Sequence, residues 1–255
     1  MSTYFTSDTH FGSERTLELS KRPFASVKEM DDTMISNWNK IVTNNDYVYH
    51  LGDFGNYEVV PKLNGKITLI WGNYELKEFL DKYRIRGIIS TFQYWSDYVA
   101  DKYDIYKRNH MNLKPDSDEN YWQFYSMILN EQVHSGDKLS YDIQEIYNCQ
   151  EKFKSFLLND VGFADVVDFS GLNIRIEKGV KTYSLYMNHE PCMLNQLPTN
   201  DYEKMLFGHI HGRQMVKKFG LDVGVDAHHF RPISTDDVIF YLEAINEHYD
   251  YNVFF

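Results

Sequence analysis

Four short apolar runs recur along the chain, and each ends in a polar turn that contains glycine or asparagine. Runs of this length, bounded by such turns, are typical of buried β-strands followed by loops. The first residues of the chain form a fifth strand-like run, which leads directly into Asp8 and His10. The four later runs are YVYHLGD (47–53), ITLIWGN (67–73), YSLYMNHE (183–190) and KMLFGHIHG (204–212).

The segment 26–42 follows a different period. Its apolar residues recur three and four positions apart, which is the spacing of one face of an α-helix, and Ser26 can cap the first turn. Strands that alternate with such helices predict an α/β fold. The segment 173–189 predicts a β-hairpin that joins these strands. Because the two strands of a hairpin are antiparallel, we expect mixed sheets.

Residues 84–160 lack the pattern of a strand followed by a turn and are rich in Tyr, Trp and Phe. We interpret them as a mostly helical insertion that interrupts a single domain spanning 1–255. One interpretation is that the insertion packs on the core or on a second subunit, which would allow a homodimer. The other is that it forms a cap that shapes a substrate pocket.

Composition limits the classes of partner. The chain of 255 residues is 43% hydrophobic, which is enough for a sizeable core, and its formal net charge is −11. Without a Lys/Arg run, a long footprint for duplex nucleic acid is not expected, whereas nucleotides or short single strands remain possible. Cys149 and Cys192 form no CxxC pair, so we expect a reduced, cytoplasmic protein. No stretch of about eighteen apolar residues predicts a membrane span, and no export signal is evident.

Side chains that bind metals follow every one of the strand-like runs. In open α/β sheets, ligands bind at the carboxyl ends of the strands, so residues that are distant in sequence can converge there. Any one of them alone is weak evidence, because single histidines and carboxylates are usually structural, but the ordered set predicts a site for two cations. The seven residues are Asp8, His10, Asp53, Asn73, His189, His209 and His211.

Oxygen and imidazole donors without thiolate suit Mn²⁺, Fe²⁺, Zn²⁺ or Ni²⁺ better than Ca²⁺, and Mn²⁺ is the ion that we expect. Two ions about 3.5–4 Å apart need a shared ligand, and a carboxylate can bridge them because it has two oxygens. Asp53 is the candidate bridge.

Five motifs resemble the pattern of calcineurin-like metallophosphoesterases, in particular small bacterial and phage-encoded members. The family pattern is Asp-x-His, Gly-Asp, Gly-Asn-His-Asp/Glu, a further His and Gly-His-x-His, and the corresponding segments here are SDTH, LGDF, GNYE, NHEP and GHIH. The resemblance covers residues 4–83 and 162–240, where VGVDAHHFRPIS (223–234) is similar to the closing strand and loop. It implies a four-layered αββα sandwich outside the insertion.

The resemblance also implies two ligand sets and a reaction. Asp8, His10, Asp53 and His211 would hold one metal, and Asp53, Asn73, His189 and His209 the other. The implied reaction is hydrolysis of a phosphoester by a metal-activated water, with Asp53 as a central catalytic residue.

The chain departs from the family at the proton donor, because Tyr74 stands where the family has the His of Gly-Asn-His. A free phenol is mostly protonated at neutral pH and can donate a proton, but it is a weaker acid than imidazolium. We therefore expect catalysis by Tyr74 to favour esters with good leaving groups.

Three functions compete at this stage. The first is a phosphodiesterase or phosphomonoesterase acting on nucleotide-type or other small phosphoesters. The second is a metal-bearing pseudoenzyme whose aromatic insertion binds a protein partner. The third is a nuclease for single strands, in which aromatic residues would stack on bases.

Other residues have lesser roles in this interpretation. Arg22 could bind a substrate phosphate as a planar fork of donors, or it could anchor a loop. His50 could be a core residue, or it could orient Asp53 through a hydrogen bond. His228 and His229 are interpreted as solvated loop residues, or one of them as part of the pocket rim.

Overall fold

The computed structural model describes residues 1–83, 148–168, 171–191 and 203–248. Most of the predicted insertion therefore lies outside the described residues. In its last part, residues 148–156 are helical and are followed by a π-helical turn at Leu157–Val161, as expected for that stretch.

The chain divides into two compact units. One comprises Met1–Lys77, Lys154–Leu194 and Thr199–Phe255, and the other comprises Glu78–Phe153 and Asn195–Pro198. In the described part of the second unit, the ring of Phe153 packs against those of Phe79 and Tyr83, at centroid distances of 5.8 and 6.4 Å. All the candidate ligands belong to the first unit.

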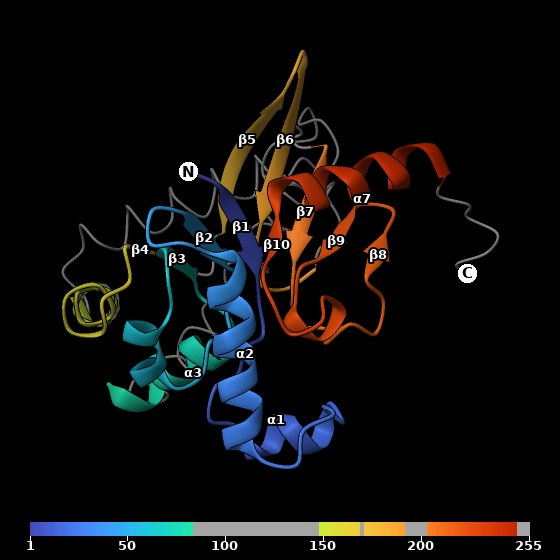
Figure 1. Ribbon diagram of the computed structural model, residues 1–255. Coiled ribbons are helices and arrows are strands. Elements are labelled where there is room, and N and C mark those ends of the chain that lie inside the picture. Colours follow the sequence, from blue (N-terminus) through green and yellow to red (C-terminus); the bar gives the residue numbers. More distant parts are fainter. Residues whose placement is uncertain (84–147, 169–170, 192–202, 249–255) are drawn as a thin grey trace, which may run out of the picture. The chain divides into compact units, whose positions relative to one another are not determined.

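The first unit contains a five-stranded sheet in the order β10-β1-β2-β3-β4 (Figure 1). Strands β1 to β4 are parallel and β10 is antiparallel to β1, so the sheet is mixed. The strands are β1 (Thr3–Thr6), β2 (Tyr47–His50), β3 (Lys66–Ile70), β4 (Asp165–Val167) and β10 (Ile233–Ser234).

A second five-stranded sheet has the order β5-β6-β7-β9-β8 and is also mixed. The predicted hairpin is confirmed, because β5 and β6 pair antiparallel from Leu172↔Met187 to Lys178↔Lys181. Strand β7 is parallel to both β6 and β9. The strands are β5 (Leu172–Lys178), β6 (Lys181–Met187), β7 (Lys204–Phe207), β8 (Val216–Lys217) and β9 (Gly220–Asp222).

The described helices include α1 (Glu14–Leu19), α2 (Val27–Ile41), α3 (Asn73–Lys82) and α7 (Thr235–His248), together with 3₁₀ segments at Tyr57–Lys62 and Val225–Ala227. Helix α2 confirms the prediction for 26–42: the Ser26 side chain accepts a hydrogen bond from the Glu29 amide, and Met30, Met34 and Trp38 are its buried face. None of the helices in the described segments combines the length and the apolar composition that a membrane crossing requires.

One hydrophobic core joins the two sheets. Side chains from β1 and β3 of the first sheet lie in the same buried cluster as side chains from β5, β6, β7 and β9 of the second, and α7 adds a further face. Helix α7 contacts β1 and β10 as well as β8 and β9. The strand ends of both sheets are thus held in a fixed relation, which brings together the loops that carry the candidate ligands.

Candidate metal centre

Backbone hydrogen bonds hold the loops after β1 and β2 side by side. The Leu51 amide donates to the Thr6 carbonyl at the strand ends (2.8 Å), and beyond them the Asp8 amide donates to the Gly52 carbonyl (3.0 Å) and the His10 amide to the Asp53 carbonyl (3.0 Å). Asp8, His10 and Asp53 are therefore placed by main-chain pairing that continues past the strands.

The predicted ligands have an unusual backbone conformation. Eight non-glycine residues have a positive φ in the described segments, and five of them are predicted ligands. Left-handed backbone is strained for residues with a Cβ, and such strain collects at functional sites. The strain therefore supports a functional role for these loops. The five φ angles are 56° for Asp8, 47° for His10, 57° for Asp53, 70° for His209 and 50° for His211.

Two glycines allow the loops to approach this closely. Gly52 has a φ of +87°, and a Cβ there would lie 2.9 Å from His189 Nδ1. At Gly208 a Cβ would lie 2.2 Å from Asp8 Oδ2. Gly52 and Gly208, which precede Asp53 and His209, are therefore required, because a Cβ at either position would crowd another candidate ligand.

Asp8, His10 and His211 form the first group of candidate ligands. Asp8 Oδ1 lies 3.8 Å from Nε2 of both His10 and His211. Asp8 Oδ1 and both ring nitrogens of His10 are buried and have no hydrogen-bond partner among the described residues. Buried polar atoms are nearly always paired, so a cation bound between them would satisfy atoms that are otherwise costly to bury.

The second group is more compact. His189 Nε2 lies 2.8 Å from Asn73 Oδ1, and His209 Nδ1 lies 3.2 Å from each of these two atoms. An ion bound at 2.0–2.2 Å keeps neighbouring ligand atoms about 3 Å apart. His189 Nδ1 donates to the Leu51 carbonyl (2.8 Å), so in a neutral ring the lone pair is at Nε2 and faces the other ligands.

Asp53 lies between the two groups. Its Oδ2 is 3.4 Å from His10 Nε2 and its Oδ1 is 3.5 Å from His189 Nε2. The Tyr74 amide donates to Oδ1 (2.9 Å) and fixes the carboxylate. The structure thus brings all seven predicted ligands together. It also places Asp8 beside Asp53 and His189, so both carboxylates adjoin both groups.

Burial sets the protonation of the centre in the metal-free protein. Desolvation lowers the pKa of His10 to about 2, with the neighbouring His211 adding to the shift, so this imidazole is neutral and can bind a metal. Desolvation raises the pKa of Asp53 to about 7; the attraction of His189 opposes this shift, and the nearby carboxylates of Glu75 and Asp8 add to it. A proton and a metal ion therefore compete for Asp53.

Asp226, which the sequence analysis did not single out, orients His211. Its Oδ2 lies 2.8 Å from His211 Nδ1, which directs the Nε2 lone pair towards Asp8. Although burial raises the pKa of Asp226, its hydrogen bonds to His211 and Arg22 outweigh burial and hold that pKa below its ordinary value. Asp226 thus remains ionised in this network.

The environment of Arg22 favours the loop-anchoring alternative over substrate binding. Its buried guanidinium donates to both carboxylate oxygens of Asp226 (2.8 Å each) and to the carbonyls of Asp8 (2.6 Å) and Thr9 (2.8 Å). With its donors engaged in this way, it does not line the cavity described below.

Glu75 was also missed, although it belongs to the quoted GNYE segment. Its carboxylate accepts hydrogen bonds from the backbone amides of Asp53 (2.8 Å), Phe54 (2.9 Å) and Gly72 (2.8 Å). One buried side chain from α3 therefore connects the loop after β2 to the loop after β3.

The core alternative holds for His50, whereas the prediction for His228 is wrong. His50 is fully buried, and its Nε2 pairs with the Thr9 hydroxyl (2.9 Å) rather than with Asp53. His228 is not solvated: it is 4% exposed, and its Nε2 donates to the Asp222 carbonyl (2.6 Å). Both imidazoles contribute to packing behind the centre. His229 adopts a left-handed φ of 56°.

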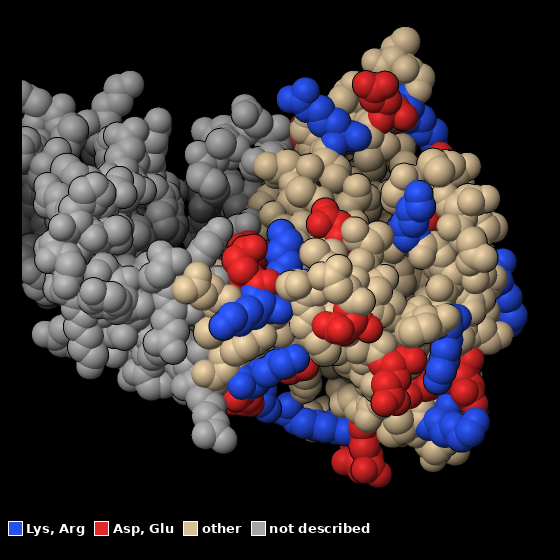
Figure 2. Space-filling model, turned by 90° about the vertical axis from the view of Figure 1, so that its left-hand side faces the viewer, with Lys and Arg blue, Asp and Glu red and all other residues tan. Residues whose placement is uncertain are grey.

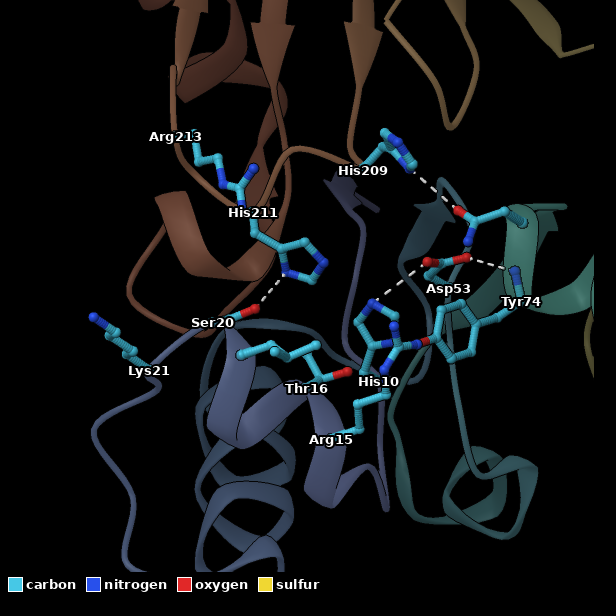
Figure 3. Close-up of a pocket in the computed structure, with 12 residues that line it drawn as sticks. His10, Arg15, Thr16, Ser20, Lys21, Asp53, Tyr74, His209, His211 and Arg213 are labelled. Atoms are coloured by element: carbon cyan, nitrogen blue, oxygen red, sulfur yellow. Dashed lines mark hydrogen bonds and ion pairs between the residues drawn. The ribbon is translucent and has the colours of Figure 1, made fainter.

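A cavity of about 340 Å³ opens over the candidate ligands (Figure 3). Tyr74 lines it, packs edge-on against His10 at a ring-centroid distance of 4.7 Å, and accepts a hydrogen bond from Arg15 Nη1 (2.9 Å). Tyr74, which stands where the family that the motifs resemble has its donor histidine, therefore lies beside the centre and faces the cavity. The cavity is lined by His10, Arg15, Thr16, Leu19, Ser20, Lys21, Asp53, Asn73, Tyr74, His209, His211 and Arg213.

No protein-family model matches the chain. An uncharacterised protein of Methanocaldococcus jannaschii is 39% identical over 90 residues, which is 32% of this chain and 50% of that protein. A protein of unknown function from Aquifex aeolicus, known from a crystal structure, is similar over 94% of this chain and 98% of its own, with a TM-score of 0.49 and 16% identity. Neither relative has a described activity, so a functional assignment depends on the residues of the centre.

Proposed function

We propose that this chain is a dinuclear metal-dependent phosphoester hydrolase, a phosphodiesterase or phosphomonoesterase of the calcineurin-like metallophosphoesterase type. The observation that carries the proposal is the convergence of the seven predicted ligands, among which Asp8 Oδ1 and His10 Nε2 are buried without a hydrogen-bond partner in the described part of the chain. Because buried polar atoms without partners are costly, this arrangement suits a cation-binding site better than a purely structural cluster.

The architecture is compatible with the αββα sandwich that the resemblance implies. Two mixed sheets share one core, and α7 contacts strands of both sheets. We propose that the helices form the outer layers of this sandwich.

Asp8, His10, Asp53 and His211 would hold one ion, and Asp53, Asn73, His189 and His209 would hold the other. The oxygen and nitrogen donors fit Mn²⁺, with Fe²⁺, Zn²⁺ or Ni²⁺ as alternatives. Such ions, when bound, supply Lewis acidity towards a phosphate and a water of lowered pKa.

The protein's own contribution would be orientation and proton supply. Asp226 fixes the tautomer of His211, and the Tyr74 amide fixes Asp53. Because the Tyr74 hydroxyl accepts its hydrogen bond from Arg15, its own hydrogen remains free to reach a departing oxygen in the cavity. A positioned acid of this kind contributes about 10²- to 10⁴-fold to the rate.

The proposed substrates are small nucleotide-type phosphoesters. On the face shown in Figure 2, positive and negative side chains are interspersed and form no continuous basic stripe. Together with the net charge of −11, this favours a small ester over duplex nucleic acid.

Hydrolysis of bis(p-nitrophenyl) phosphate, with and without Mn²⁺, tests the proposal. We expect Mn²⁺-dependent release of p-nitrophenol that Asp53→Asn abolishes, since asparagine tolerates left-handed backbone but supplies only one oxygen. The matched control is Asp237→Asn, whose carboxylate accepts a hydrogen bond from the Ser234 amide at the start of α7. Unchanged turnover by Asp53→Asn would refute the proposal, and Mn²⁺ binding without hydrolysis would support the pseudoenzyme instead.

A further inference from the structure

The cavity over the centre is positively charged in a chain that is acidic as a whole. Three cationic side chains, Arg15, Lys21 and Arg213, line it, whereas Asp53 is the one carboxylate in its lining. The chain as a whole has 37 acidic and 26 basic residues. The local excess of positive charge is therefore opposite in sign to that of the whole chain.

Two of the three cations, Lys21 and Arg213, lie on the His211 side of the opening, whereas Arg15 lies beside Tyr74. Arg15 contacts Tyr74, whose ring packs on His10. Lys21 follows Ser20, whose hydroxyl lies 3.3 Å from His211 Nδ1. Arg213 is two residues beyond His211, and Figure 3 shows Lys21 and Arg213 beyond His211, on the side of the opening away from Asp53 and Tyr74.

Two of these cations are free to bind a ligand. The side chains of Lys21 and Arg213 form no ion pair or hydrogen bond with any residue of the described segments. The left-handed φ of 51° at Lys21 belongs to the C-cap of α1, where the amides of Lys21 and Arg22 donate to the carbonyls of Glu18 (3.2 Å) and Leu17 (3.1 Å). This turn brings Lys21 to the lining of the cavity.

The opposite side of the centre has a different character. A second cavity of about 340 Å³ adjoins Asn73 and His189 and is lined by Trp71, Gly72, Asn73, Leu76, Asn188, His189 and Glu190. It has a carboxylate and no lysine or arginine in its lining, so it attracts an anion less than the first cavity does. An anionic extension of a substrate would therefore be directed to one side only.

We propose that Lys21 and Arg213 form an anion subsite beside the metal centre that binds a second phosphate group of the substrate. The inference rests on the proposed function, because the reacting phosphate would occupy the centre itself. Guanidinium groups match phosphate oxygens as a planar fork, and the lysine ammonium adds a mobile point charge. The substrate class is then a phosphoester with a further phosphate, such as a nucleoside bisphosphate, rather than a simple diester.

Two phosphonates that differ by one anionic group test the subsite without turnover, because their P–C bonds are not hydrolysed. Propylphosphonate and 1,3-propanediylbisphosphonate are titrated into the Mn²⁺-loaded full chain by calorimetry, with equal excess Mn²⁺ in cell and syringe. We expect the bisphosphonate to bind about tenfold more tightly. Removal of one exposed cation by Lys21→Gln or Arg213→Gln should weaken bisphosphonate binding about threefold, within the range for exposed ion pairs.

The double variant should lose most of the preference while propylphosphonate binding stays within about twofold, since an isolated exposed charge contributes little at a distance. Lys40→Gln, which removes an exposed charge from the last turn of α2, is the matched control and should change neither affinity. Equal affinity of the wild type for the two probes, or an unchanged preference in the double variant, would overturn the subsite. Absence of Mn²⁺-dependent ester hydrolysis would instead refute the proposed function, so the two failures are distinguishable.

Discussion

Asp226→Asn should weaken metal binding without touching a ligand. Asp226 Oδ2 lies 2.8 Å from His211 Nδ1, and its two oxygens receive hydrogen bonds from Arg22 Nε and Nη2 at 2.8 Å. Asparagine has one oxygen and one amide group. If the amide faces His211, the imidazole hydrogen moves to Nε2, which can then no longer bind a metal; if the oxygen faces His211, two donors meet at Arg22.

The size of the effect follows from this contact. Loss of a partner that orients a ligating histidine costs about 10- to 100-fold in metal affinity, which corresponds to about 1.4–2.8 kcal/mol. Because Arg22 keeps its hydrogen bonds to the Asp8 and Thr9 carbonyls, we expect the variant to fold. Its free energy of unfolding should be about 1–3 kcal/mol below that of the wild type.

Calorimetric titration of Mn²⁺ into the metal-free protein measures the affinity, and near-ultraviolet circular dichroism confirms that the variant is folded at the temperature used. The control is again Asp237→Asn, which replaces a carboxylate that caps α7. If folded Asp226→Asn bound Mn²⁺ within twofold of the wild type, His211 would not be a ligand oriented by Asp226.

Three further changes have defined outcomes. Burial raises the pKa of Asp53 to about 7, so this group makes the metal-free protein less stable as the pH rises from about 4 to 7. Because the proton competes with the metal at lower pH, Mn²⁺ should raise Tm more at pH 8 than at pH 6. An equal rise in Tm at the two pH values would contradict this competition. Glu75→Gln leaves one side-chain oxygen to accept from three backbone amides, so it should lower the free energy of unfolding, measured in urea titrations, by about 1–3 kcal/mol. A loss below about 0.5 kcal/mol, which is typical of surface substitutions, would contradict the anchoring role of Glu75. Tyr74→His should raise kcat most for esters with poor leaving groups, and no difference across a leaving-group series would remove Tyr74 from the proton path.

The parts of the fold that the sequence predicts are those with a local pattern. Strands β2, β3, β6 and β7 and helix α2 lie where apolar periodicity and turn residues indicate. Short strands such as β8 and β10 have two residues each, which is too few for any period to be recognised. Their existence depends on pairing with partners that are distant in sequence.

The convergence of the candidate ligands is predictable for a related reason. They follow strand ends, and neighbouring parallel strands deliver their carboxyl ends to one edge of a sheet. The roles of Arg22 and Asp226 are not predictable in this way, because the two are 204 residues apart and meet only through the tertiary fold. The same holds for His50, for which the sequence leaves open a core position or a hydrogen bond to Asp53, and whose partner is Thr9.

Anomalous diffraction at the manganese edge, from crystals equilibrated with Mn²⁺, decides whether this is a two-metal centre. We expect two peaks about 3.5–4 Å apart, one beside Asp8, His10 and His211 and the other beside Asn73, His189 and His209, with Asp53 between them. A single peak, or none at saturating Mn²⁺, would contradict a dinuclear centre and the hydrolytic function proposed from it.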